Sequence, residues 1–304
     1  MYIKVHKYCL HIFFLVIFLI EGHIPMYATS RALLVGISNY SQNAGSGWSD
    51  INGVNDINIL QGELYKQGFL VTSLLDVNAT AFNIRALLQD IYTCANPNDT
   101  IYIHFSGHGQ PVEDLNGDEL DGWDEAFVPI DAQMWYKQGE YEGENHFIDD
   151  ELNIFINKIR RKLGADGLLV VAIDACHSGT MSRDENDVPF EDESPIRGTY
   201  VGLSKEKTFH PIREKEITHH YAIETQNDLA TTIILEACQA WQQNTEIKVG
   251  NNYYGPLSYA IYSRIKEQSF GMVVNNVESV NLTMQQVLPK WRNQQIVVET
   301  SIVR

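Results

Sequence analysis

The feature that most constrains the fold is a regular alternation of short apolar runs with amphipathic segments after residue 30. The runs are rich in Val, Ile and Leu and end in glycine or polar residues, as buried strands do. The segments between them carry apolar residues at helical spacing. Alternating strands and helices favour a mostly parallel sheet, because each helix returns the chain to the same end of the sheet. We therefore predict an α/β fold with helices on both faces of one sheet. The expected strands are 31–40, 70–76, 99–109, 167–179, 230–241 and 294–303, and the expected helices are 52–69, 80–95, 149–164, 255–268 and 282–291.

The charge of the chain narrows its class of partners. The 304 residues are 44% hydrophobic, enough for one large domain or two small ones. A formal net charge of −17 repels nucleic acids and anionic membrane faces. The same charge attracts cations and basic peptides. Peptide or protein substrates with basic residues are therefore favoured as partners over nucleic acid, and the oligomeric state stays open.

Residues 1–28 have the pattern of a signal peptide. Lys4 and Lys7 form a basic start, and an apolar run follows at 10–20. This run is shorter than the ~20 residues that span a bilayer, and Ala28 is small enough to suit a cleavage point. We predict export to the periplasm or the cell exterior, with no stable membrane insertion after the signal is removed. An uncleaved anchor is the alternative.

The cysteine count points to a free thiol. Cys9 lies in the signal, and Cys94, Cys176 and Cys238 remain, so at least one has no partner within the chain. No Cys-x-x-Cys pair is present, which argues against a structural zinc site. Cys94 and Cys238 are expected to be buried thiols, whereas Cys176 directly follows an apolar run.

Two of the predicted strands end in reactive residues. The third runs into His108 and Gly109, and the fourth into Asp174 and Cys176. Parallel neighbours would bring these residues to one edge of the sheet, where α/β proteins bind ligands. A thiolate and an imidazole suffice for nucleophilic catalysis, and the N–H groups of Gly109 and Cys176 would form an oxyanion hole. The alternatives are a buried inert cysteine and a histidine in a turn.

The segments "YIHFSGHGQ" and "VAIDACHSG" resemble the catalytic segments of the caspase and metacaspase cysteine peptidases, of the prokaryotic metacaspase type. The order of histidine and cysteine, with a helix between them, also matches. The resemblance implies a caspase-like three-layer αβα sandwich with one catalytic domain. It further implies a large-subunit-like region at 29–183, an inter-subunit loop at 184–228 and a small-subunit-like region at 229–304.

The resemblance also assigns roles to individual residues. Cys176 matches the nucleophile and His108 the general acid and base, with no cofactor needed for the chemistry. Asp56, Ser106 and Asp174 match the pocket that accepts Arg or Lys before the cut bond. A buried carboxylate pair is costly unless a cation neutralises it, which agrees with that specificity. Another clan member with different specificity, such as a clostripain-like or separase-like peptidase, and a non-enzymatic exported binding protein on the same fold are the alternatives.

An acidic run at 114–131 raises the question of calcium. It lacks the glycine that an EF-hand loop needs, because Glu119 stands at the sixth position. The family resemblance instead implies a calcium activator site built from separate loops. An acidic solvated surface, with two of these acids opening a helix, is the alternative. The matching residues are Asp124, Asp149, Asp150 and Asp184.

The long segment at 180–228 shows no sustained apolar periodicity. Related enzymes are often cut in this region, and an acidic pocket would accept a basic residue of the chain itself. We therefore hypothesise self-cleavage after one of its basic residues, while a simple insert without this role is the alternative. The candidates are Arg197, Lys205, Lys207, Arg213 and Lys215.

Overall fold

The computed structural model describes residues 28–117, 119, 121–176, 194–206, 208, 221, 223, 225–239, 242–292 and 294–301. A six-stranded sheet in the order β11-β8-β7-β3-β1-β2 forms its centre. Only β11 runs antiparallel to its neighbour, so the predicted mostly parallel sheet is confirmed. The strands are β1 (Ser30–Gly36), β2 (Leu70–Leu75), β3 (Thr100–Ser106), β7 (Leu168–Asp174), β8 (Thr231–Glu236) and β11 (Val297–Thr300).

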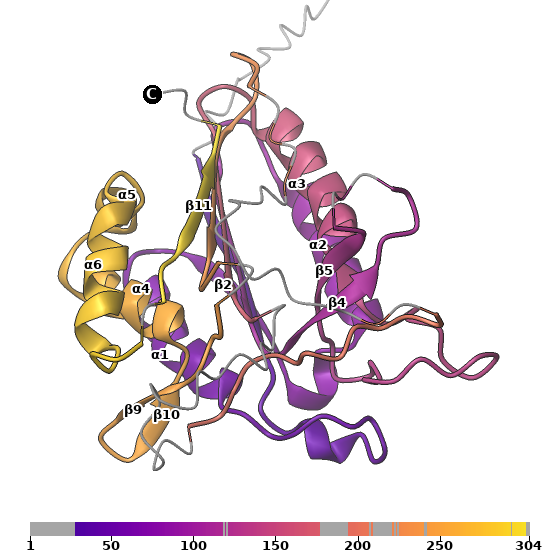
Figure 1. Ribbon diagram of the computed structural model, residues 1–304. Coiled ribbons are helices and arrows are strands. Elements are labelled where there is room, and N and C mark those ends of the chain that lie inside the picture. Colours follow the sequence, from indigo (N-terminus) through magenta and orange to yellow (C-terminus); the bar gives the residue numbers. More distant parts are fainter. Residues whose placement is uncertain are drawn as a thin grey trace, which may run out of the picture.

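Helices cover both faces of this sheet, as Figure 1 shows. One face carries α2 and α3, and the other carries α1, α4, α5 and α6. The apolar sides of these helices and the two faces of the sheet form two separate hydrophobic cores. The result is the three-layer arrangement expected for an alternating chain. The helices are α1 (Gly53–Lys66), α2 (Ala81–Cys94), α3 (Asp149–Leu163), α4 (Pro256–Glu267), α5 (Phe270–Val274) and α6 (Val277–Val287).

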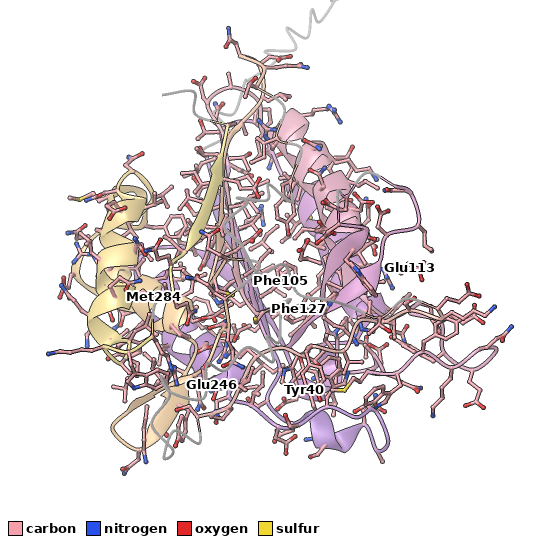
Figure 2. The ribbon with its side chains drawn as sticks, viewed as in Figure 1. Tyr40, Phe105, Glu113, Phe127, Glu246 and Met284 are labelled. Carbon is pink, nitrogen blue, oxygen red and sulfur yellow. The ribbon has the colours of Figure 1, made fainter. Side chains whose placement is uncertain are left out.

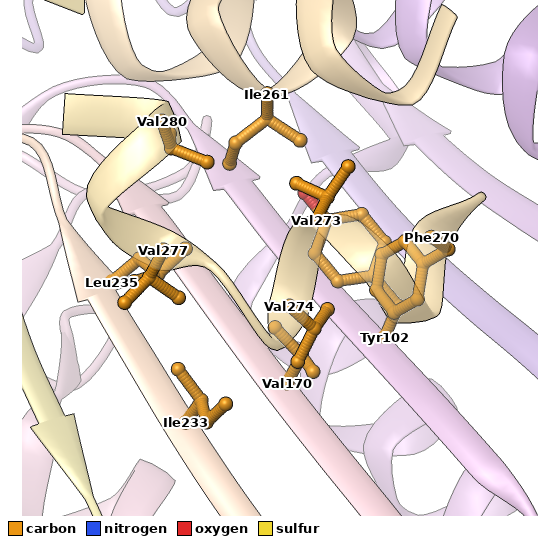
Figure 3. Close-up of a pocket in the computed structure, with 10 residues that line it drawn as sticks. All are labelled: Tyr102, Val170, Ile233, Leu235, Ile261, Phe270, Val273, Val274, Val277 and Val280. Atoms are coloured by element: carbon orange, nitrogen blue, oxygen red, sulfur yellow. The ribbon is translucent and has the colours of Figure 1, made fainter. Parts of the chain in front are cut away.

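The two cores can be followed in Figures 2 and 3. Figure 2 shows Phe105 and Phe127 between the sheet and α3, with ring centroids 5.1 Å apart, and Met284 on the opposite side in α6. Figure 3 shows a small pocket between the sheet and α4 to α6, lined by apolar groups such as Val170 and Ile233. Among the residues that line it, only Tyr102 has a polar side-chain atom, so the pocket lacks the convergent polar groups of a catalytic site.

Short strands outside the main sheet extend the molecule. Three of them, β4 (Gly109–Glu113), β5 (Trp123–Phe127) and β6 (Phe147–Ile148), form an antiparallel sheet near α3. A hairpin of β9 (Ile247–Val249) and β10 (Asn252–Tyr254) precedes α4. Within the described part of the chain, none of the helices has the length and apolar composition needed to cross a bilayer.

Candidate active site

The register of the sheet places pocket residues next to each other at its carboxyl edge. Gly36 of β1 pairs with Ser106 of β3, which pairs with Asp174 of β7. The loops that follow these strands lie at the same end of the sheet, where Figure 2 shows Tyr40 and Glu246. Parallel pairing therefore gathers residues from distant parts of the sequence, as α/β sheets do at their ligand sites.

His108 lies just beyond β3 in an aromatic cage. Its ring stacks on Trp48 at a centroid distance of 5.0 Å and lies 4.7 Å from Tyr40. The Tyr40 hydroxyl accepts a hydrogen bond from the His108 N–H and donates to the Val128 carbonyl. The Nε2 atom of His108 lies 2.9 Å from the Ser49 carbonyl oxygen. The ring therefore has a fixed place and a fixed orientation.

This hydrogen bond decides the tautomer of His108. A carbonyl oxygen only accepts, so Nε2 carries the proton and Nδ1 of the neutral ring has the lone pair. Nδ1 is buried and has no hydrogen-bond partner among the described residues. Burial lowers the pKa of His108 to about 4, so the ring is neutral near pH 7 and its Nδ1 can accept a proton.

Cys176 follows β7 and is buried. Its thiol donates a hydrogen bond to the Gln242 carbonyl at 3.2 Å and is also hydrogen-bonded to the Cys238 thiol. This bond and burial raise the pKa of Cys238 well above its ordinary value. Cys238 is therefore a buried thiol as expected, whereas Cys94 is exposed at the end of α2 and the expectation for it was wrong.

Two main-chain N–H groups converge on one carbonyl oxygen at this edge. The N–H of Gly109 and the N–H of Cys176 each donate to the Arg197 carbonyl at 3.0 Å. These are the two groups that we predicted to form an oxyanion hole. A carbonyl polarised by two such donors is prepared for nucleophilic attack.

Asp56 forms one wall of a pocket beside these groups. It lies in the first turn of α1 and is fully buried. The Ser106 hydroxyl donates to one of its oxygens at 2.6 Å, and the Gly255 N–H donates to the other at 3.0 Å. Burial raises the pKa of Asp56 to about 7, although the nearby Arg197 lowers it.

Asp174 forms the opposite wall and is held by three donors. The N–H and the hydroxyl of Ser258 each donate to Oδ2 at 2.7 Å, and the Asn244 amide donates to Oδ1 at 2.7 Å. These bonds come from the start of α4 and from the segment after β8. The carboxylate is therefore fixed before any ligand binds.

The side chain of Arg197 fills this pocket and is fully buried. Its Nη2 lies 2.8 Å from an Asp56 oxygen, and its Nη1 lies 3.6 Å from an Asp174 oxygen. Nη1 also donates to the Ser106 hydroxyl at 2.7 Å. Burial lowers the pKa of Arg197, but the surrounding carboxylates raise it above its ordinary value.

A third carboxylate, Glu246, completes the pocket. It accepts hydrogen bonds from Nε and Nη2 of Arg197 at 3.2 and 2.9 Å. The main-chain N–H and the side-chain amide of Asn52 donate to its two oxygens at 2.7 and 2.6 Å. Glu246 was absent from the sequence prediction, although an acid that follows a parallel strand by ten residues could reach this edge.

The chain before Arg197 lies as an added strand. The Arg197 N–H donates to the Asn244 carbonyl at 3.0 Å, and the Glu246 N–H donates to the Pro195 carbonyl at 2.9 Å. Such antiparallel pairing binds an extended peptide through its main chain.

The chain after Arg197 continues along β4. Gly198 forms parallel bridges with Gly109 and Cys176. Five residues later, the Leu203 N–H donates to the Pro111 carbonyl at 2.8 Å, and the Leu203 side chain is buried in the core. The bond between residues 197 and 198 therefore lies beside the main chain of Gly109 and Cys176 and is anchored on both sides.

The other expected sites have less structural support. Asp149 and Asp150 open α3, and Asp124 lies in β5, paired with Val112 of β4. Within the described residues, no three His, Cys, Asp or Glu side chains converge to hold an ion. Of the processing candidates, Lys205 is half exposed and outside the pocket. The remaining predicted residues, Asp184, Lys207, Arg213 and Lys215, lie outside the described residues.

Comparison with protein families decides the classification. The model of the metacaspase, peptidase C14 domain matches residues 30–184, half of the chain. The chain belongs to the metacaspase family. This family domain is that of a cysteine-type peptidase, and the matched range includes His108 and Cys176. Arg197 and Glu246 lie beyond it.

Curated relatives share this domain. Metacaspase-1B of Aspergillus fumigatus is 34% identical over 158 residues, which cover 49% of this chain and 35% of the relative. Metacaspase-3 of Arabidopsis thaliana is 33% identical over 184 residues, covering 57% and 45%. The chain thus spans about a third to a half of the length of these metacaspases. Protein GSU0716 from Geobacter sulfurreducens has the same fold, with a TM-score of 0.58 and 19% identity over 90% of this chain and 93% of its own.

Proposed function

We propose that this metacaspase is an endopeptidase that cleaves peptide bonds after Arg or Lys, with Cys176 as nucleophile and His108 as general acid and base. One observation carries the proposal: a peptide segment already lies in the site with an arginine in the pocket. The carbonyl of Arg197 accepts from two N–H groups while its guanidinium lies among three carboxylates. This is the placement that a substrate's basic residue needs before attack.

The chemistry follows from the groups at the carbonyl. For the reaction, the Cys176 thiol must turn from the Gln242 carbonyl toward His108 Nδ1 and give it its proton, after which the thiolate attacks the carbonyl carbon to form a tetrahedral oxyanion. The N–H groups of Gly109 and Cys176 stabilise that charge. The proton on Nδ1 then passes to the leaving amine, and an acyl-enzyme forms that water hydrolyses. The Ser49 carbonyl keeps Nε2 protonated throughout, so Nδ1 remains the atom that exchanges the proton.

A peptide panel tests this proposal. Quenched fluorescent peptides that carry Arg, Lys or Asp before a glycine should be cleaved only after Arg or Lys. Cys176→Ala should lower kcat/KM by at least about 10³-fold, because it removes the nucleophile. Cys94→Ala, at an exposed thiol far from the site, is the matched control and should leave the rate unchanged. Preferred cleavage after Asp, or an active Cys176→Ala variant, would contradict the assignment.

We further propose that the enzyme cuts its own chain between Arg197 and Gly198. Purified protein should yield two fragments on a denaturing gel, and the sequence of the new N-terminus should begin at Gly198. Arg197→Gln should stop this cut, because the pocket then receives no cation. Lys205→Gln, at the exposed candidate nearby, should not. A cut that persists in Arg197→Gln would place the processing bond elsewhere.

Calcium activation remains a prediction from the family resemblance, and no step of the chemistry above depends on it. The test is the rate at which the same peptides are cleaved in EGTA and after calcium is added back. Equal cleavage rates in both conditions would contradict activation by calcium.

A further inference from the structure

The pocket around Arg197 uses every donor of a guanidinium. Nε donates to Glu246, and Nη2 contacts both Glu246 and Asp56. Nη1 donates to the Ser106 hydroxyl at 2.7 Å and to the Asp174 main-chain carbonyl at 3.2 Å. All five N–H bonds of the guanidinium therefore have acceptors, which lie around its edge. A planar fork of five donors is the arrangement that distinguishes arginine from lysine.

Glu246 is the group on which that distinction depends. Asp56 and Asp174 flank the end of the side chain, where the ammonium of a lysine would also lie. Glu246 instead bonds Nε and Nη2, the edge of the guanidinium that lysine lacks. Asn52 fixes both Glu246 oxygens, so the carboxylate is held in place before the cation arrives. A lysine would leave part of this buried charge without a partner, which is costly.

The residue after the cut is restricted by a second, independent contact. A Cβ built on Gly198 would overlap the carbonyl oxygen of Cys176 and lie 2.9 Å from the Cys176 Cβ. The oxygen and carbon belong to the residue that carries the nucleophile, so neither can move without disturbing the site. Gly109 and Cys176 hold the main chain of Gly198 by parallel bridges, so it cannot shift freely to relieve this overlap.

From these contacts we infer that the enzyme selects Arg–Gly bonds: Glu246 distinguishes arginine from lysine, and the main chain of Cys176 excludes a side chain at the next residue. This inference rests on the proposed function and names its substrate class. The natural substrates would be proteins that expose an extended Arg–Gly segment.

Four quenched fluorescent peptides test the inference. Their parent has the sequence of residues 194–200, Ser-Pro-Ile-Arg-Gly-Thr-Tyr, and the others carry Lys for Arg, Ala for Gly, or both. They are given to the self-cleaved protein and to the Arg197→Gln chain, in which the pocket is free of its own arginine. We expect kcat/KM to be highest for Arg–Gly and at least about 10-fold lower for Lys–Gly and for Arg–Ala, as expected for an unpaired buried charge or an overpacked contact.

Glu246→Gln then isolates the contribution of the third carboxylate. It should lower kcat/KM for Arg–Gly by about 10- to 100-fold and leave that for Lys–Gly unchanged or higher, because only arginine bonds this edge and a lysine leaves the carboxylate partly unpaired. Asp56→Asn should weaken both peptides, since its carboxylate contacts the end of either side chain. Glu267→Gln, an exposed acid of α4, is the control for a loss of negative charge alone.

The outcomes separate the inference from the proposed function. Equal losses for Arg and Lys in Glu246→Gln, or a wild-type enzyme that cleaves both equally, overturn the role of Glu246. Cleavage of Arg–Ala as fast as Arg–Gly overturns the role of Cys176 in excluding side chains. Failure to cleave any of the four peptides would instead contradict the endopeptidase assignment. The wild-type ratios need no variant, so they remain informative even if Glu246→Gln does not fold.

Discussion

Three buried imidazoles are held neutral by the fold. The His104 ring lies between the Tyr102 hydroxyl at 2.7 Å and the Ser258 hydroxyl at 2.9 Å. The His146 ring lies between the Tyr141 hydroxyl at 2.8 Å and the Gln110 side-chain oxygen at 2.7 Å. The third ring is that of His108 in the candidate site. Burial lowers the pKa of His104 and His108 to about 4 and that of His146 to about 3. His104 bonds the same Ser258 hydroxyl that donates to Asp174, so this buried group supports the pocket.

These pKa shifts predict a loss of stability in acid. Each histidine has a folded pKa below its ordinary value of 6.5, so the unfolded chain binds more protons as pH falls from 6.5 to about 4. Asp56 acts in the opposite direction, because its pKa is raised from 3.8 to about 7 and the folded chain binds its proton first. Three imidazoles outweigh one carboxyl group, so the free energy of unfolding should fall steeply below pH 6.5.

His146→Gln tests this prediction away from the candidate site. A glutamine can still donate to Gln110 and accept from Tyr141, but it does not titrate. The variant should lose about 3 kcal/mol less between pH 6.5 and 4 than the parent, at about 1.4 kcal/mol per pKa unit. Urea unfolding measured across this range gives the slope. An unchanged slope would mean that His146 is not held neutral in the folded state.

Residues at strand ends could be predicted, and residues that reach the site from loops could not. Asp174 and Cys176 directly follow an apolar run, so their place at the sheet edge follows from the parallel fold. Trp48 and Ser49 lie in a loop whose sequence has no apolar periodicity. Glu246 follows the end of β8 by ten residues. Which loop residue meets which pocket depends on the loop path, which local sequence does not specify.

At the scale of elements, the start of α1 packs closely against the strand ends that form the pocket. A Cβ on Gly53 would overlap the carbonyl oxygens of Ser106 and Ile37, at the ends of β3 and β1. Asp56 follows one turn later, so the close approach of the helix to these strands sets where its carboxylate lies. The glycine at this position is needed for that approach rather than for flexibility.

Two identical substitutions in this one helix should have opposite effects. Gly53→Ala should lower the free energy of unfolding by about 1–3 kcal/mol and reduce kcat/KM, because the added methyl pushes the helix away from the strands. Gly62→Ala, where the Cβ meets open space, should raise stability by about 0.5–1 kcal/mol and leave kcat/KM unchanged. For each variant, denaturant unfolding measures the stability and cleavage of the Arg peptide measures kcat/KM. A stabilised Gly53→Ala variant would refute the close contact.

The elements of the main sheet were predictable and the small ones were not. Long apolar runs and helical periodicity predicted the six strands and most of α1 to α4, because burial on one side leaves a pattern in the sequence. Strand β4 has the sequence Gly-Gln-Pro-Val-Glu, which has no such pattern. It pairs with β5 and with the chain after Gly198, so its conformation depends on tertiary contacts.

At the scale of the molecule, the proposed cut divides the chain without dividing the core. The part before Arg197 supplies β1, β2, β3 and β7, and the part after it supplies β8, β11 and α4 to α6. Strand β7 pairs with β8 from Leu168 to Ile173 in the centre of the sheet. One hydrophobic core combines Leu60 of α1 with Met284 of α6. Separation of the parts would expose both the sheet edge and this core.

Cleavage should therefore leave one particle made of two chains. After self-cleavage is complete on a denaturing gel, size-exclusion chromatography in native buffer should give the same elution volume as uncut Cys176→Ala protein. The physical reason is the apolar surface between β7 and β8 and between α1 and α4, whose exposure costs about 25 cal/mol per Å². Two separate, smaller species on the column would show that the segments on either side of Arg197 hold the parts together in the intact chain.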